Sequence, residues 1–161
     1  RHGPRRKAVP GRAPLFIGDS TGIIAAPKLA GIGFRSDARG CRQYTEAIGM
    51  VSRLRRAHRL PRVVVVALGV NGPIPPGAIG RTVRAMGSRG KLVLVTPRRQ
   101  GTSRRRMLAA GRRLSRRVKV FDWARYSAGK PWFAGDGIHV SHFGAKKYTR
   151  YLRPALQLAR R

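Results

Sequence analysis

RVVVVALGVNG, residues 62–72, decides the fold of this chain. Four valines, an alanine and a leucine follow one another without a polar residue, so both faces of the segment are apolar. A strand of this kind is typical of a parallel sheet, whose two faces are both covered by helices. We therefore expect a buried strand over residues 62–68, ended by Gly69.

Other short segments are also apolar, as buried strands are, and they alternate along the chain with helical patterns. Four further strands are expected, over residues 15–17, 33–37, 91–96 and 118–121. Amphipathic helical patterns lie between or after them, over residues 21–29, 44–58, 78–86, 103–117 and 142–158, the last with a bend near Pro154. The alternation predicts an α/β fold with helices on both faces of a parallel sheet.

Length and composition limit the remaining possibilities. A chain of 161 residues is long enough for one ordinary domain with its own core. Residues 1–13 are basic and contain proline and glycine, so we expect a disordered arm or linker there and a folded domain over 14–161. The single cysteine, Cys41, excludes an internal disulfide framework and a four-cysteine zinc site. No apolar stretch approaches the roughly 20 residues that span a bilayer.

Charge is the second unusual property. The chain has 36 Lys and Arg residues against 5 Asp and Glu, a net charge of +31. Such a field attracts polyanions, whether nucleic acid, anionic lipid or a phosphate-bearing cell-wall polymer. The sequence has no zinc-finger spacing, RNP-type strand or basic zipper, so nucleic acid is not the expected partner. Because arginines occur in nearly every segment, enrichment through the base composition of the genome explains the charge equally well.

Three short motifs supply the parts for acyl transfer through a serine. Ser20 and Asn71 each follow an expected strand, and the carboxyl ends of parallel strands meet at one edge of a sheet. Ser20 begins a helical stretch, so its backbone amide can hold a developing oxyanion. His139 is the candidate base, Asp136 can fix its tautomer, and the Asn71 carboxamide is a second oxyanion donor.

Four blocks, in order, resemble the SGNH (GDSL-like) hydrolase family, and more narrowly the carboxyl-terminal domains of peptidoglycan O-acetyltransferase-like proteins. The blocks are LFIGDS at 15–20, DARGCRQ at 37–43, VALGVNG at 66–72, and DGIH at 136–139 followed by Gly144. The resemblance implies a three-layer α/β/α sandwich, flavodoxin-like, with a five-stranded parallel sheet. It also implies Ser20 as nucleophile, His139 as base and Asp136 as its orienting acid.

The second block departs from the family pattern. The glycine stands one residue early, at Gly40, and Cys41 occupies its expected place. The resemblance implies that a backbone amide of this block completes the oxyanion hole with Ser20 and Asn71, and it leaves open which of Gly40 and Cys41 donates.

The implied activity is that of a serine esterase or O-acyltransferase. The substrate would be a short acyl ester on a carbohydrate or cell-envelope polymer, with no metal or organic cofactor. We expect an extracytoplasmic position, and an anionic polymer or membrane surface as partner of the basic face. The alternative is a catalytically idle basic module that binds nucleic acid or an anionic polymer. A flavin or nucleotide binder is a further rival, because Ser20-Thr21-Gly22 partly resembles a phosphate-holding loop.

Other residues have weaker functional interpretations. Cys41 is a less favoured nucleophile than Ser20, and a metal site formed by Asp136, His139 and His142 is less favoured than the triad. His142 is expected as a supporting residue or as the cap of the last helix, and Asp122 as a cap or ion-pair partner. Four aromatic residues before the DGIH block are expected mainly to pack its loop onto the core: Trp123, Tyr126, Trp132 and Phe133.

Overall fold

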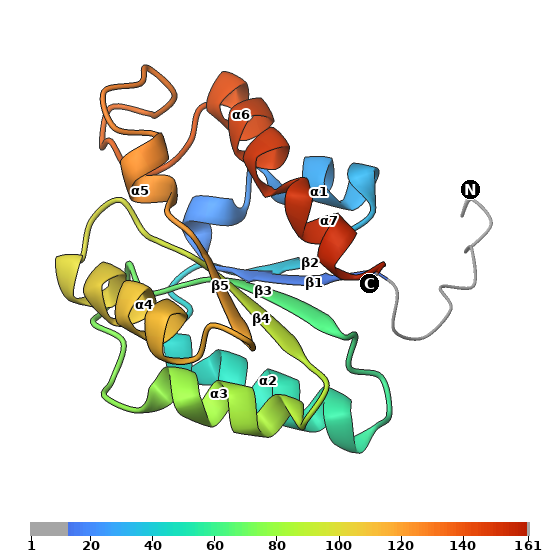
Figure 1. Cartoon of the computed structure of the whole chain (residues 1–161). Helices are drawn as coiled ribbons and strands as arrows, with labels where there is room; N and C mark the ends of the chain where they lie inside the picture. The colour runs from blue at the N-terminus through green and yellow to red at the C-terminus, as the bar shows by residue number, and fades with distance from the viewer. Residues whose placement is uncertain (1–12, 161) are drawn as a thin grey trace.

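One five-stranded parallel sheet forms the centre of the computed structural model, which describes residues 13–160 (Figure 1). The strands lie in the order β2-β1-β3-β4-β5. Their bounds are β1 Leu15–Gly18, β2 Arg35–Ala38, β3 Val63–Ala67, β4 Lys91–Val95 and β5 Val118–Phe121. All four neighbouring pairs are parallel, so the carboxyl ends of the strands meet along one edge. The predicted α/β fold is confirmed, while nearly all of the expected disordered arm lies outside the described residues.

Helices cover both faces of the sheet. The helices are α1 Ala26–Ile32, α2 Tyr44–Arg56, α3 Ala78–Met86, α4 Gly101–Arg113, α5 Trp123–Tyr126, α6 His142–Leu152 and α7 Pro154–Leu158. Figure 1 shows α2, α3 and α4 on one face and α1, α6 and α7 on the other. No helix in residues 13–160 is both long enough and apolar enough to cross a membrane.

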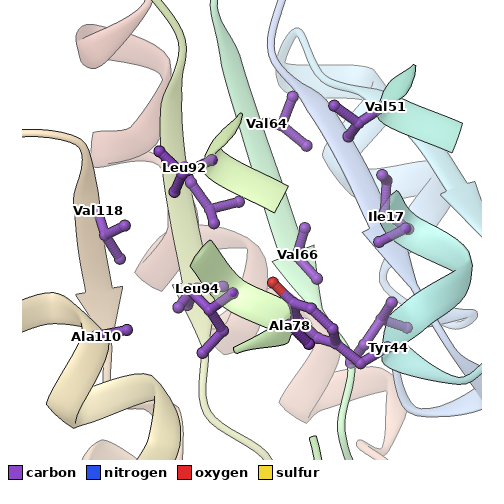
Figure 2. Close-up of a cluster of buried hydrophobic side chains, with 14 of the residues drawn as sticks. Ile17, Tyr44, Val51, Val64, Val66, Ala78, Leu92, Leu94, Ala110 and Val118 are labelled. Carbon is purple, nitrogen blue, oxygen red and sulfur yellow. The ribbon is translucent and has the colours of Figure 1, made fainter. Parts of the chain in front are cut away.

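Strand β3 explains why the sheet is buried on both sides. Val64 and Val66 pack into the core under α2, α3 and α4, as Figure 2 shows. Val63 and Val65 pack into the opposite core, against α1, α6 and α7. All four side chains have no exposed surface. Since burial of a valine contributes about 1.5–3 kcal/mol, the apolar run 62–68 accounts for much of the attraction between the layers.

The helix expected over residues 21–29 forms, but its bounds are shifted to Ala26–Ile32. A 3₁₀ turn, η1, occupies Ser20–Gly22, and α1 begins only at Ala26. The Asp19 carboxylate accepts a hydrogen bond from the Thr21 amide and so closes a tight turn directly after β1. Pro27 lies in the first turn of α1, where its missing N–H is tolerated.

Other helix boundaries also differ from the expectation: α2 ends at Arg56 instead of residue 58, and α4 begins at Gly101 instead of residue 103. The helix expected over 103–117 ends at Arg113, because the chain turns at Leu114, whose carbonyl accepts from the amides of Arg117 and Val118 before β5 begins. The last helical pattern divides at Arg153, next to Pro154, as the expected bend indicated. The four-residue helix α5 has no sequence prediction, because one turn is too short to show a period.

Candidate active site

Ser20 lies at the carboxyl edge of the sheet, two residues after β1. Its turn is fixed by Asp19, which is 1% exposed and accepts from both the amide and the hydroxyl of Thr21, at 2.9 and 2.6 Å. The Asp19 carbonyl also accepts from the Gly22 amide. Ser20 is therefore the first residue of a tight turn with its side chain half-buried at the surface.

His139 and Asp136 approach Ser20 from a loop 119 residues further along the chain. The Ser20 Oγ and His139 Nε2 atoms are 3.1 Å apart, and His139 Nδ1 lies 2.5 Å from Asp136 Oδ2. The other carboxylate oxygen, Oδ1, accepts from the backbone amides of Ile138 and His139. These two amides, together with the imidazole, hold the pKa of Asp136 well below its usual range. The carboxylate stays ionised beside the ring, so Nδ1–H is the favoured tautomer and Nε2 faces Ser20 as an acceptor.

The loop that carries this pair is fastened at its base. Phe133 and Val140 form an antiparallel bridge, and the Ala134 amide donates to the His139 carbonyl at 2.8 Å. Arg98, which follows β4, donates to the Gly137 carbonyl at 3.0 Å and to the Ser127 carbonyl at 2.8 Å. Its guanidinium lies 4.0 Å from the centre of the Phe133 ring.

Gly144 provides the closest contact between this loop and the helix that follows it. A Cβ atom at position 144 would lie 1.8 Å from the carbonyl oxygen of Trp132. That oxygen accepts hydrogen bonds from the amide and hydroxyl of Ser141, the N-cap of α6. Only glycine allows α6 to approach the start of the loop so closely.

The second and third sequence blocks meet beside Ser20. Arg42 is 5% exposed and donates to the carbonyls of Gly18 and Asp37 and to the Asp37 carboxylate, so its side chain fixes the turn next to β1. The Asn71 carboxamide donates to the Arg42 carbonyl at 3.2 Å, and the Gln43 side chain donates to the Asn71 carbonyl at 2.9 Å. One N–H of the Asn71 amide is thereby anchored, which leaves the second N–H to meet a ligand.

Ser103 holds the Asn71 loop in place, a role that no pattern in the sequence indicates. Its fully buried hydroxyl donates to the Gly69 carbonyl at 2.7 Å and accepts from the Ile74 amide at 3.1 Å. Gly69 has a φ of 107°, and a Cβ there would lie 2.9 Å from the Ser103 hydroxyl. A glycine is therefore required where the loop passes over the start of α4.

Gly40 and Cys41 form the turn between β2 and the Arg42 anchor. Cys41 has a φ of 58°, in the left-handed region that glycine favours, whereas Gly40 lies outside that region and has open space around its Cα. The conformation that suits glycine is therefore occupied by cysteine in this chain. The Cys41 side chain is exposed.

A second carboxylate, that of Asp19, lies close to His139 but inside the protein. Its Oδ2 atom has no hydrogen-bond partner, and burial raises the pKa of this group. The bonds from Thr21 and the charge of His139 act in the opposite direction and favour the carboxylate form. When ionised, Asp19 adds negative potential next to the active-site loop.

Other predicted residues lie away from the triad. His142 is exposed in the first turn of α6, and the cap is Ser141, so the expectation that His142 caps this helix is wrong. Within residues 13–160, no three His, Cys, Asp or Glu side chains gather as metal ligands would. Asp122 pairs with Arg104 at 2.6 Å, as expected of an ion-pair partner.

The four aromatic residues before the loop pack together. The rings of Trp123 and Trp132 stack with their centres 5.7 Å apart, and Tyr148 of α6 meets Trp123 edge-on at 4.9 Å. Tyr126 and Phe133 join the same cluster. This confirms the expected packing role.

The enclosed space beside the turn that carries Ser20 is small. A cavity of about 20 Å³ lies among Asp19, Thr21, Arg98, Ile138 and Tyr148. Above it the site is open, since the His139 and Asp136 side chains are 39% and 43% exposed. A reactant would therefore approach Ser20 from the surface.

Both a sequence comparison and a structure comparison find similar known proteins. No family model matches the chain. It is 30% identical over 147 residues to the O-acetyltransferase OatA of Staphylococcus aureus, an alignment that covers 85% of this chain and 24% of OatA. The chain therefore spans about a quarter of the length of this curated relative.

Solved structures share the fold over almost the whole chain. The C-terminal catalytic domain of Streptococcus pneumoniae peptidoglycan OatA, which carries a methylsulfonyl adduct, has a TM-score of 0.79 and 24% identity, and the alignment covers 93% of this chain and 95% of that domain. A carbohydrate esterase family 3 protein from Talaromyces cellulolyticus has a TM-score of 0.68 at 14% identity, covering 92% and 98%. A GDSL-like lipase from Bacteroides thetaiotaomicron has a TM-score of 0.67 at 15% identity, covering 92% and 89%. This chain is a homologue of the OatA catalytic domain and has the fold of the SGNH (GDSL-like) hydrolases.

Proposed function

We propose that this chain is a serine esterase or O-acetyltransferase that acts on short acyl esters of peptidoglycan or a related cell-envelope carbohydrate. The observation that carries the proposal is the chain of contacts from Ser20 Oγ to His139 Nε2 and from His139 Nδ1 to Asp136, at 3.1 and 2.5 Å. This is the arrangement that activates a serine hydroxyl.

The reaction follows from these contacts in two steps. Ser20 Oγ attacks the ester carbonyl carbon while its proton passes to His139 Nε2, and Asp136 stabilises the resulting imidazolium. When the ester C–O bond breaks, the imidazolium returns the proton to the leaving oxygen, and the acyl group remains on Ser20. Water or a carbohydrate hydroxyl then attacks the acyl-enzyme, with His139 again accepting and returning the proton.

The oxyanion hole of this proposal has three donors. These are the Ser20 amide, the free N–H of the Asn71 carboxamide, and one backbone amide of the turn at Gly40 and Cys41. The anchoring of Asn71 on the Arg42 carbonyl favours this role, because it fixes the amide before the substrate binds. Loss of one such donor lowers kcat by about 10²–10³ in serine hydrolases.

The openness of the site favours a short acyl group on a bulky carrier. A cavity of about 20 Å³ is little more than the space for one water molecule and cannot accept a long acyl chain. The exposed His139 and Asp136 side chains leave room for a polymer to lie across the surface. A peptidoglycan substrate also implies an extracytoplasmic position, which fractionation of cells that express the full-length protein would test.

The test is intact-mass analysis after treatment with a fluorophosphonate. We expect one adduct on the parent chain and none on Ser20→Ala or His139→Ala, while the exposed-serine control Ser115→Ala keeps the adduct. Labelling that survives in Ser20→Ala would refute the assignment of the nucleophile. Acetate release from p-nitrophenyl acetate, with and without a chito-oligosaccharide acceptor, then separates hydrolysis from transfer.

A further inference from the structure

The acidic residues of this chain are confined to one end of the molecule. Asp19 and Asp122 directly follow β1 and β5, and Asp37 is the third of four residues in β2. Glu46 lies in the first turn of α2, and Asp136 lies in the active-site loop. These five are all the acids in the sequence, so the opposite, amino edge of the sheet has none.

A groove of about 890 Å³ lies at that amino edge. Three consecutive connections line it, those from α2 to β3, from α3 to β4 and from α4 to β5, which enter three neighbouring strands. They bring seven basic side chains to one hollow: Arg55, His58, Arg62, Arg89, Lys91, Arg116 and Arg117. The lining contains neither an acid nor a Phe, Tyr or Trp.

Two of these cations are fixed, and they shape the groove. Arg117 donates to the Gly90 carbonyl at 2.7 Å and also to the Gly87 carbonyl. Lys91 donates to the Arg116 carbonyl at 2.6 Å. Both side chains are half-buried, so their charge stays in place at the floor of the hollow.

Three further arginines of the groove, Arg55, Arg89 and Arg116, are exposed residues. Their guanidinium groups make no hydrogen bond or ion pair within the described part of the chain, and that of Arg55 lies beside Gly87. Like charges held this close repel one another, and an anion that bridges them relieves the repulsion. An arginine fork also matches the oxygens of a phosphate in shape.

We propose that this groove binds a flexible phosphodiester polymer with a polyol backbone, through the exposed guanidinium groups of Arg55, Arg89 and Arg116. Proteins that bind single-stranded nucleic acid combine a basic groove with aromatic side chains on which the bases stack, and the lining has no aromatic side chain of this kind. An anionic lipid surface also attracts basic side chains, but membrane binding is strengthened by apolar side chains that insert, and the large exposed apolar residues of the described chain lie elsewhere: Ile23, Ile24, Tyr126 and Phe143. A polymer of phosphates joined by small polyols can be bound by basic side chains alone, provided that their spacing matches that of the phosphates.

The position of the groove leaves Ser20 free while the polymer is bound. A strand of five residues spans about 17 Å, so the amino edge is roughly that far from the carboxyl edge where Ser20 lies. A polymer in the groove would hold the domain at a phosphate-bearing surface while the ester site faces its own substrate. This binding does not depend on the proposed chemistry of Ser20, and the two are tested separately.

The test measures binding of a fluorescent poly(glycerol phosphate) oligomer to the Ser20→Ala chain over a series of salt concentrations. The groove variant carries Arg55→Ala, Arg89→Ala and Arg116→Ala. Because one exposed ion pair changes affinity by up to about fivefold, we expect the three substitutions to weaken binding about tenfold or more. The slope of log affinity against log salt should fall by about 2, the value for three lost phosphate contacts.

The matched control removes three positive charges outside the groove, at Arg81, Arg105 and Lys146, each exposed on its helix. Equal weakening in the control would overturn the proposal, because it would assign the binding to diffuse charge. Groove-dependent binding of oligo-dT or of vesicles containing anionic lipid, at equal or greater affinity, would overturn the polymer class. Thermal unfolding of the groove variant, followed by circular dichroism and compared with the parent chain, verifies that the fold survives.

Discussion

Replacement of Gly144 by alanine tests whether the approach of α6 to the active-site loop sets the catalytic geometry. The added Cβ would lie 1.8 Å from the Trp132 carbonyl oxygen, where an ordinary contact begins near 3.4 Å. The helix and the loop must therefore separate by roughly 1.5 Å. Since Trp132 opens the loop that carries His139, the imidazole should move relative to Ser20.

The expected magnitude has two parts. A misplacement of about 1 Å at reacting groups lowers the rate by about 10²-fold, and overpacking of a tight contact lowers stability by about 1–3 kcal/mol. We therefore expect Gly144→Ala to fold with a reduced melting temperature and to release acetate from p-nitrophenyl acetate about a hundredfold more slowly. The two assays are thermal unfolding followed by circular dichroism and steady-state ester hydrolysis.

Gly31→Ala is the matched control, because Gly31 also lies inside a helix and a Cβ there meets nothing within 4 Å. This variant should be more stable by about 0.5–1 kcal/mol and fully active. A Gly144→Ala enzyme that retains the parent rate and melting temperature would refute the reasoning, because it would mean that the loop can move aside without displacing His139.

Three further changes have expected outcomes. Cys41→Gly should raise the free energy of unfolding by about 1 kcal/mol in denaturant titrations, because φ at this position is 58°, whereas Gly40→Ala should change it little; a less stable Cys41→Gly would contradict the strain. Asp19→Asn should remove a pH dependence: burial raises the pKa of Asp19 in the folded state, so its contribution to stability is present in acid and is lost as the pH rises through that pKa. Denaturant unfolding of the parent and of Asp19→Asn at pH 4 and pH 7 measures this. If the two proteins differ in free energy of unfolding by the same amount at both pH values, the pKa of Asp19 is not raised. Arg98→Met keeps the apolar stem but loses the bonds to the loop at Gly137, so kcat should fall about tenfold with little change in KM; an unchanged kcat would mean that other contacts hold the loop.

The sequence was sufficient to predict the type and bounds of those strands and helices whose apolar pattern is long or unambiguous. The valine run of β3 is apolar at every position, so only a strand covered on both faces could accommodate it. Helix α3 was bounded correctly, because its apolar period and its flanking glycines agree. The tight turn at Ser20 was mistaken for the start of a helix, since the bond from the Asp19 carboxylate to Thr21 is a competing local interaction that periodicity does not detect.

In the candidate site, too, some residues could be predicted from local sequence and others depend on contacts between distant segments. The order of the motifs, and their positions after strands, were enough to expect that Ser20, Asn71 and the Asp136–His139 pair would share one edge of the sheet. The side chains that hold them in place were not predictable: Arg42, Arg98 and Ser103 bond to backbone carbonyls of segments 5 to 39 residues away. A side chain that bonds to a carbonyl leaves no pattern in the sequence, because every residue type offers the same acceptor.

The sequence by itself therefore determined the layered α/β fold, the candidate chemistry and the positive charge, because these depend on residue type and local order. Only the tertiary structure decided the 3.1 Å approach of His139 to Ser20, the left-handed backbone at Cys41 and the separation of all acids from the basic groove. Each of these depends on where segments remote in sequence come to lie. That placement is set by the packing of α6 and the connecting loops against the sheet, which no local pattern encodes.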